Sequence, residues 1–206
     1  MFPLGVAAQT TGVWTRILAL NFDGANGSTT FTDLTGRHTV AAVGSAAITG
    51  NQLSVNQDGY ALTDSGADHA DFNFSASDFQ ISCDVTASSI GNDYLWMKSS
   101  GGAFGICLRL LDAGGGNCHL VVCNQNAIGF LSTTVPTIVG SQHHLEVSRI
   151  ADNWKMKLDG VVVATAAASE GTTPTSGAGY NGIQIAGGAG GPRLSAYVDN
   201  VDVWKR

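Results

Sequence analysis

Charged residues, and glutamate above all, are scarce in this sequence. Only 13% of its 206 residues are charged, and glutamate occurs just twice, as Glu146 and Glu170. Amphipathic helices need such residues along their exposed face, so a helical domain is not expected. Glycine occurs 27 times, which suits short strands joined by tight turns. The hydrophobic share of 44% is enough to fill one sizeable core.

Basic residues are few and dispersed. Ten Lys and Arg stand against 16 Asp and Glu, which gives a formal net charge of -6. A surface that binds the phosphates of nucleic acid needs clustered Lys and Arg. We therefore expect no nucleic-acid partner, and the acidic excess indicates a well-solvated surface.

Long apolar runs are missing as well. No stretch approaches the roughly 18 residues of a membrane-spanning helix. The opening MFPLGVAAQTTGVWTR lacks the basic and apolar regions of a signal peptide. We expect no membrane span, and a protein made in the cytoplasm without a classical export signal.

Cysteine chemistry is not indicated by spacing. The four cysteines form no CxxC pair, and no histidine stands at a metal-ligand spacing from two of them. Free thiols are the favoured prediction, as expected in a reducing cytoplasm, although a disulfide stays open. The residues are Cys83, Cys107, Cys118 and Cys123.

The clearest structural pattern runs from Gln142 to Ala164. Apolar and polar residues alternate here with period two, which is typical of strands with one face on a core. Ala151-Asp152-Asn153 has turn chemistry, and Asp159-Gly160 between apolar runs is a strong hairpin signal. The inward residues would be Leu145, Val147, Trp154, Met156 and Leu158.

Similar short runs recur along the chain and predict about a dozen further strands. A bulge near Asp199-Asn200 would explain why Val198 and Val201 break the alternation of the last strand. The expected strands cover residues 17–22, 38–43, 46–48, 52–55, 60–63, 79–86, 94–98, 104–111, 119–124, 127–131, 142–150, 154–158, 161–165, 183–186 and 195–204. The pattern predicts an all-β, antiparallel jelly-roll β-sandwich over residues 16–206.

Residues 1–15 are predicted to form an extended arm. They lack periodicity and carry exposed-type hydrophobes. The arm either folds across its own domain or docks on a neighbouring subunit, and the sequence leaves both open. Its apolar residues are Phe2, Leu4, Val6, Val13 and Trp14.

Several segments together resemble the concanavalin A-like lectin/glucanase superfamily, especially its laminin G-like branch. The loop FTDLTGRH after LALNFDG is similar to the family's "D-x-S-G-x-x-H" loop, and HH-x-x-V-S-R followed by WKMKLDGVVVA is similar to its central hairpin. The stretches DFQISCDV and YVDNVDV are similar to two further strands. These segments span residues 17–204 in the expected order.

The resemblance implies a jelly roll of two packed antiparallel sheets. In style it is similar to laminin G-like domains of bacteriophage structural proteins. We therefore expect a non-enzymatic virion structural protein (capsid decoration, tail or fibre component). Its partners would be other virion proteins and further copies of itself, in a homo-oligomer located in the virion. The alternative is an adhesion module that binds polysaccharide on a host surface.

Aromatic residues near loop edges are the candidate sugar-binding residues, because sugars offer apolar ring faces and polar hydroxyls. For Tyr94 and Trp96, packing in the core is the favoured interpretation, since most aromatics of a sandwich are buried. The candidate set is Asn92, Asp93, Tyr94, Trp96, Tyr180 and Asn181.

Catalytic and metal chemistry gain little support. The family's glycoside hydrolases use two adjacent carboxyl groups, whereas Glu146 and Glu170 stand alone, so we expect no enzyme. Calcium is a weaker hypothesis, because the loop residues Asp58, Asp64 and Asp93 show no ligand spacing. His143 and His144 would point to opposite faces of a strand, so they cannot chelate a metal together.

Overall fold

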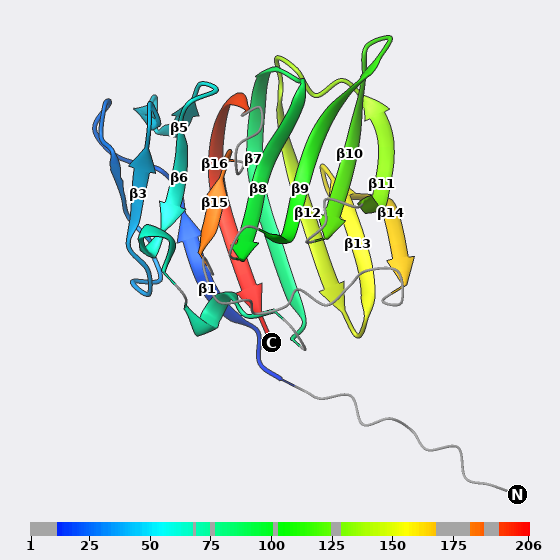
Figure 1. Ribbon diagram of the computed structural model, residues 1–206, viewed down its shortest axis with the longest axis horizontal. Coiled ribbons are helices and arrows are strands. Elements are labelled where there is room, and N and C mark those ends of the chain that lie inside the picture. Colours follow the sequence, from blue (N-terminus) through cyan, green and yellow to red (C-terminus); the bar gives the residue numbers. More distant parts are fainter. Residues whose placement is uncertain are drawn as a thin grey trace, which may run out of the picture.

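The computed structural model describes residues 12–67, 69–74, 77–100, 103–124, 129–167, 182–187 and 194–206. The regular structure of these residues is almost entirely β-strand, and the strands form two antiparallel sheets packed face to face (Figure 1). The predicted all-β sandwich is confirmed. No helix in the described ranges is long and apolar enough to cross a membrane.

The first sheet, called sheet A, is ordered β14-β13-β12-β7-β16-β5-β4, with β1 also paired to β16. Its long central strands are β7 (Phe79–Ser89) and β16 (Ser195–Lys205). The other strands are β1 (Thr15–Leu20), β4 (Ala47–Thr49), β5 (Gln52–Val55), β12 (Gln142–Ile150), β13 (Asn153–Leu158) and β14 (Val161–Ala167).

The second sheet, called sheet B, is ordered β11-β10-β9-β8-β15-β6-β3-β2. Its strands are β2 (Thr30–Phe31), β3 (Val40–Val43), β6 (Tyr60–Thr63), β8 (Asn92–Ser100), β9 (Ala103–Gly114), β10 (Asn117–Asn124), β11 (Gly129–Pro136) and β15 (Ile183–Ile185). Two short 3-10 turns, η1 (Asp64–Gly66) and η2 (Ala70–Phe72), follow β6.

The core lies between the inward faces of the two sheets. Alternate residues of each strand reach it, which is why the period-two pattern identified the strands. Trp154 packs edge-on against Phe79, with ring centroids 5.4 Å apart. Trp96 from sheet B is also fully buried in this core.

Both turns predicted in the central hairpin region are confirmed. Ala151 and Asp152 have φ of 47° and 60°, and Asp159 and Gly160 have φ of 51° and 78°. Two successive residues with positive φ match the twist of the flanking strands.

The four cysteines are buried and free, as predicted.

The predicted bulge in the last strand is confirmed and has a clear topological role. The register of β16 against β7 shifts between Asp199 and Asp202, and Asn200 has a φ of 48°. Before the bulge, β16 pairs with β5, and after it β16 pairs with β1. The bulge thus marks the point where the strand changes its neighbour.

Candidate functional site

The outer face of sheet A carries a shallow groove beside an exposed aromatic ring, which we call the Tyr197 groove. Its volume is about 310 Å³. Tyr197 is 37% exposed, although the residues on either side of it, Ala196 and Val198, are buried. The lining residues are Ser54, Val55, Asn56, Ser88, Ser195, Ala196 and Tyr197.

Strand alternation and the bulge explain why Tyr197 faces outward. Val198 points into the core, so Tyr197 must point the other way. Across the strands, Tyr197 lies opposite Thr86 of β7 and Ser54 of β5. Both partners are small, so they cannot cover the large ring, and one face of the ring stays open.

Polar groups surround this ring. Asn56 follows β5 and is exposed, and its side-chain oxygen accepts a hydrogen bond of 3.4 Å from the Ser195 hydroxyl. Ser54 and Ser88 add two further hydroxyl groups to the groove. An apolar ring beside amide and hydroxyl groups is the combination that a sugar requires.

A polar cluster continues from the groove along the same face. Asp84 accepts a 2.6 Å hydrogen bond from His144 Nδ1 and a 2.8 Å bond from Asn200 Nδ2. Asp199 is the cross-strand neighbour of Asp84. Burial raises the pKa of Asp199, and the charges of Asp84 and Asp23 raise it further, against a backbone hydrogen bond from Asn200.

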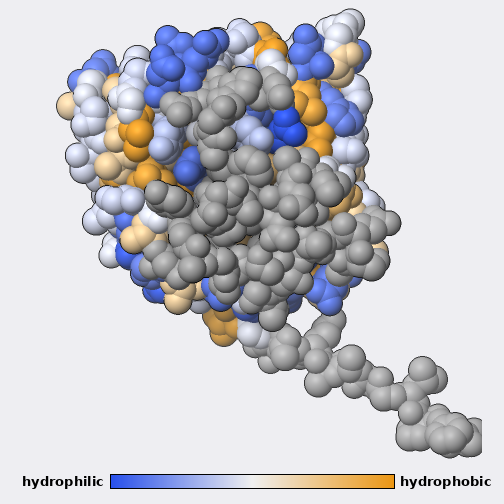
Figure 2. All heavy atoms as spheres, in the orientation of Figure 1, coloured by the Kyte–Doolittle hydropathy of each residue, from blue (hydrophilic) through white to orange (hydrophobic). Residues whose placement is uncertain are grey.

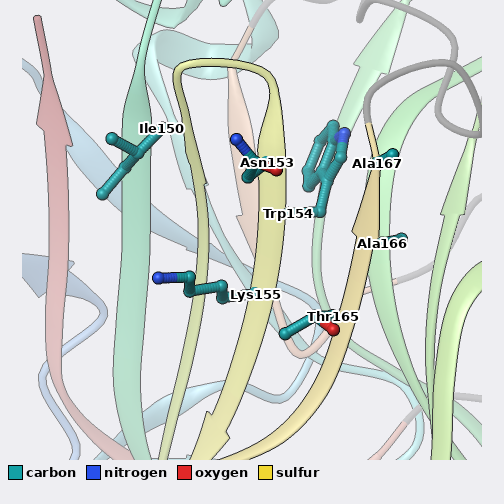
Figure 3. Close-up of a pocket in the computed structure, with 7 residues that line it drawn as sticks. All are labelled: Ile150, Asn153, Trp154, Lys155, Thr165, Ala166 and Ala167. Atoms are coloured by element: carbon teal, nitrogen blue, oxygen red, sulfur yellow. The ribbon is translucent and has the colours of Figure 1, made fainter.

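A second hollow lies at the opposite corner of the same sheet, over β12, β13 and β14 (Figure 3). Its volume is about 550 Å³. Figure 3 shows Asn153 and Lys155 extending to one side of β13 while Trp154 extends to the other. Since Trp154 is buried, this hollow offers a cation and an amide but no exposed aromatic face.

The residues that the sequence predicted to bind sugar do not gather at either hollow. Trp96 is buried in the main core. Asp93, near the start of β8, is also buried. Tyr94 is 7% exposed and packs on the outer face of sheet B against Cys107 and Val121. The side chain of Asn92 lies outside the description, as do Tyr180 and Asn181.

That outer face of sheet B is the one turned to the viewer in Figure 2. Hydrophobic and strongly hydrophilic atoms lie side by side along its upper right, near β10 and β11. The Arg109 guanidinium of β9 lies 5.1 Å from the Tyr94 ring centroid. The Tyr94 ring is therefore occupied by a cation–π contact.

Sequence reasoning did not single out Tyr197 as a ligand. The signal was available, because Tyr197 precedes the buried Val198 in a strand that the alternation rule resolves once the bulge is placed. With the bulge placed near Asp199-Asn200, the buried Val198 leaves Tyr197 on the opposite face of the strand.

The remaining predicted residues are dispersed. His143 Nδ1 contacts Asp159 at 2.8 Å, whereas His144 contacts Asp84, so the two histidines engage different partners. Glu146 forms an ion pair with Lys157 at 2.8 Å, and Glu170 lies outside the described residues.

The three calcium candidates lie in separate elements, with Asp58 in the turn after β5, Asp64 in η1 and Asp93 in β8. Asp64 accepts a bond from the Thr39 backbone, and Asp93 accepts one from the Gly91 backbone. Asp58 is exposed in the turn that follows β5. The three carboxylates therefore have separate partners and are not assembled into one site.

Only the end of the predicted arm is described. Phe2, Leu4 and Val6 lie outside the described residues. Val13 is 85% exposed, and the Trp14 ring lies 5.1 Å beneath the Arg206 guanidinium.

Comparison with known proteins gives structural but not sequence relatives. No family model matches the sequence, and no curated protein matches it. Domain 4 of AbnA, an extracellular GH43 arabinanase from Geobacillus stearothermophilus solved with arabinotriose, matches with a TM-score of 0.65 at 14% identity, over 93% of both chains.

Two larger proteins match over part of their length. Trypanosoma rangeli sialidase matches with a TM-score of 0.66 at 18% identity, over 97% of this chain and 31% of the sialidase. The binding domain of botulinum neurotoxin DC, solved in complex with SialylT, matches with a TM-score of 0.58 at 11% identity, over 92% of this chain and 47% of that one. These likenesses establish a shared β-sandwich fold.

Proposed function

We propose that this chain is a carbohydrate-binding module and that the Tyr197 groove holds the sugar. The observation that carries the proposal is the exposed Tyr197 ring with Asn56 and Ser195 beside it. An aromatic face packs against the C–H face of a sugar ring, while the amide and hydroxyl groups exchange hydrogen bonds with sugar hydroxyls.

The structural relatives support the same class of ligand. One was solved with arabinotriose and another with SialylT. The arabinanase domain matches over nearly the full length of both chains, so a module of this size and fold can bind an oligosaccharide on its own. Fold alone does not transfer a site, which is why the proposal rests on the groove itself.

The sequence also predicted a virion structural role in an oligomer, and a protein without enzymatic activity. The virion role gains no support from the structural relatives, and most of the arm on which it depends lies outside the described residues. Both remain predictions. Binding to a glycan is compatible with a location in the virion and with a location elsewhere.

The test is a glycan array with the full chain, followed by titration of the best ligand against three proteins. These are the unaltered chain, Tyr197→Ala and Lys155→Ala. Tyr197→Ala should weaken binding about tenfold, or roughly 1.4 kcal/mol, because the stacking face is lost. Lys155→Ala alters the second hollow and should leave binding unchanged.

Stability must be measured alongside. Tyr197 is half-exposed, so the melting temperature of Tyr197→Ala should stay close to that of the unaltered chain. Absence of binding to any glycan would rule out the proposed function. Binding that survives Tyr197→Ala but fails with Lys155→Ala would move the site to the second hollow.

A further inference from the structure

Two histidines and an aspartate converge beside η2, at the edge of the sandwich next to β3 and β6. They are His38, His69 and Asp71, and one ligand atom from each lies within 4.8 Å of the other two. In the described part of the chain this is the one group of three such residues. It lies apart from the Tyr197 groove, since it involves none of the lining residues of that groove.

His38 is oriented by a carboxylate at one of its two ring nitrogens. Its side chain is fully buried, and Nδ1 lies 2.7 Å from Asp64 Oδ2. The carboxylate accepts a hydrogen bond from Nδ1–H, which leaves Nε2 as the ring atom that can ligate an ion. A carboxylate behind a ligating histidine is the usual second layer of a zinc site, where it fixes the tautomer.

The Nε2 atom of His38 is buried without a hydrogen-bond partner. A buried polar atom left without a partner costs about 1–3 kcal/mol, so its position needs an explanation. This atom points toward Asp71, whose Oδ2 lies 3.4 Å away. The ring cannot turn aside easily, because it stacks on Phe72 with centroids 4.4 Å apart.

The other two groups are also prepared. His69 Nδ1 accepts a long 3.3 Å hydrogen bond from the Asp71 backbone, and an ion bound at Nδ1 would take the place of this weak bond. Asp71 is held by Arg37, whose Nε and Nη2 lie 2.6 and 2.8 Å from its two oxygens. Arg37 orients the carboxylate and leaves a lone pair of Oδ2 directed at the histidines.

Two of the three spacings between ligand atoms are close to those around a small tetrahedral ion, and the third lies within 4.8 Å. Metal bonds of about 2.0–2.1 Å in a tetrahedron place neighbouring ligand atoms about 3.3–3.4 Å apart. Asp71 Oδ2 lies 3.4 Å from His38 Nε2 and 3.6 Å from His69 Nδ1. Two imidazoles and one carboxylate favour zinc or a similar transition metal over calcium or magnesium, which prefer oxygen ligands.

We propose that His38 Nε2, His69 Nδ1 and Asp71 Oδ2 form a binding site for one zinc ion. The His69 side chain is partly exposed, so water or an external ligand can reach the ion and complete the shell. The ion supplies the partner that His38 lacks, and it ties the loop before β3 to η2.

The experiment uses the untagged full chain after treatment with a chelator. Isothermal titration with zinc chloride should give one equivalent bound, and zinc should raise the melting temperature because it binds the folded state. Calcium chloride should do neither. Cobalt(II) in place of zinc should give the visible absorption of a tetrahedral site, and zinc should abolish it.

His69→Ala is the informative variant, since this partly exposed side chain can be removed without opening the core. It should weaken zinc binding at least tenfold and abolish the cobalt absorption. His119→Ala, which removes a histidine on β10 bound to Thr134, should bind zinc like the unaltered chain. No zinc binding by the unaltered chain, or binding that His69→Ala leaves intact, would overturn the proposal.

Discussion

Asp84 of β7 and Asp199 of β16 lie directly opposite each other on the outer face of sheet A. Two like charges at this spacing repel. Hydrogen bonds from His144 and Asn200 offset the negative charge of Asp84. The repulsion between the two carboxylates therefore acts mainly on Asp199. Burial and the neighbouring carboxylates raise the pKa of Asp199 in the folded chain.

Asp199→Asn should therefore stabilise the protein in a pH-dependent manner. Because the folded pKa is raised, the unfolded chain loses this proton first, so Asp199 costs stability as the pH rises above about 4. The variant should melt higher than the unaltered chain at pH 7 and at the same temperature near pH 3. Thermal melts across this range provide the measurement. Asp112→Asn, at an exposed site on β9, is the control for removing a carboxylate elsewhere on the sandwich.

Asp33 is predicted to have the opposite pH dependence. Burial alone would raise its pKa, but hydrogen bonds from the side chain and backbone of Thr35 and from the backbone of Ala19 and His38 lower it overall. A lowered folded pKa stabilises the protein above about pH 4, and this contribution disappears as the pH falls through the folded pKa.

Asp33→Asn should destabilise the chain by about 1–3 kcal/mol at pH 7, because an amide cannot accept all of these bonds. The difference between variant and unaltered chain should shrink below pH 4. Denaturant unfolding at pH 7 and pH 3 measures it. An equal difference at both values would show that the charge of Asp33 contributes nothing.

Ala151 is a site where glycine should stabilise the fold. Its φ of 47° is costly for a residue with a Cβ atom. Its hydrogen bonds to Asp78 and Asn153 use backbone atoms only, so a side-chain change preserves them. Ala151→Gly should raise the free energy of unfolding by up to about 1 kcal/mol.

The matched control is Ala113→Gly, at an exposed position in β9. There glycine removes no strain and should cost about 0.5–1 kcal/mol. Denaturant melts of both variants give opposite signs if the turn geometry is right. A loss at both positions would contradict the positive φ of Ala151.

The four thiols should be unreactive toward thiol reagents in the folded protein and reactive once it unfolds. All four are buried and free. Cys107 and Cys123 lie opposite each other on β9 and β10, and hydrogen bonding from Cys107 lowers the pKa of Cys123 to about 7, with help from Arg109.

A colourimetric thiol assay should detect four thiols per chain in denaturant without reductant and few in buffer. Because the thiolate is the reactive form, Cys123 should be the first to be labelled in the slow native reaction, which peptide mapping can identify. A denatured count of two would reveal a disulfide.

Strands and turns were readable from the sequence because both are local. The alternation of Trp154, Met156 and Leu158, and the Asp159-Gly160 pair, each fix a structure within a few residues. The bulge near Asn200 was also signalled locally, by Val198 and Val201 falling out of phase.

The sites were not readable because they are long-range. Asn56 and Ser195 meet only when β5 and β16 pair. His38 and Asp71 are brought together by the pairing of β3 with β6 and by η2, and no ligand spacing in the sequence marks them. For Tyr94 and Trp96 the sequence favoured packing in the sandwich over binding a sugar, and strand packing does bury both.

The bulge also divides β16 into two parts that should respond differently to mutation. Residues after it are locked by β1 and the core, while the three paired with β5 carry the exposed ring. Because side chains alternate strictly, deleting one residue before the bulge would turn Tyr197 inward and expose its buried neighbours. An outward-facing side chain of this half can be substituted without disturbing the core, whereas an insertion or deletion would exchange its two faces. The bulge thus acts as a boundary between a part of the strand open to variation and a part that is not.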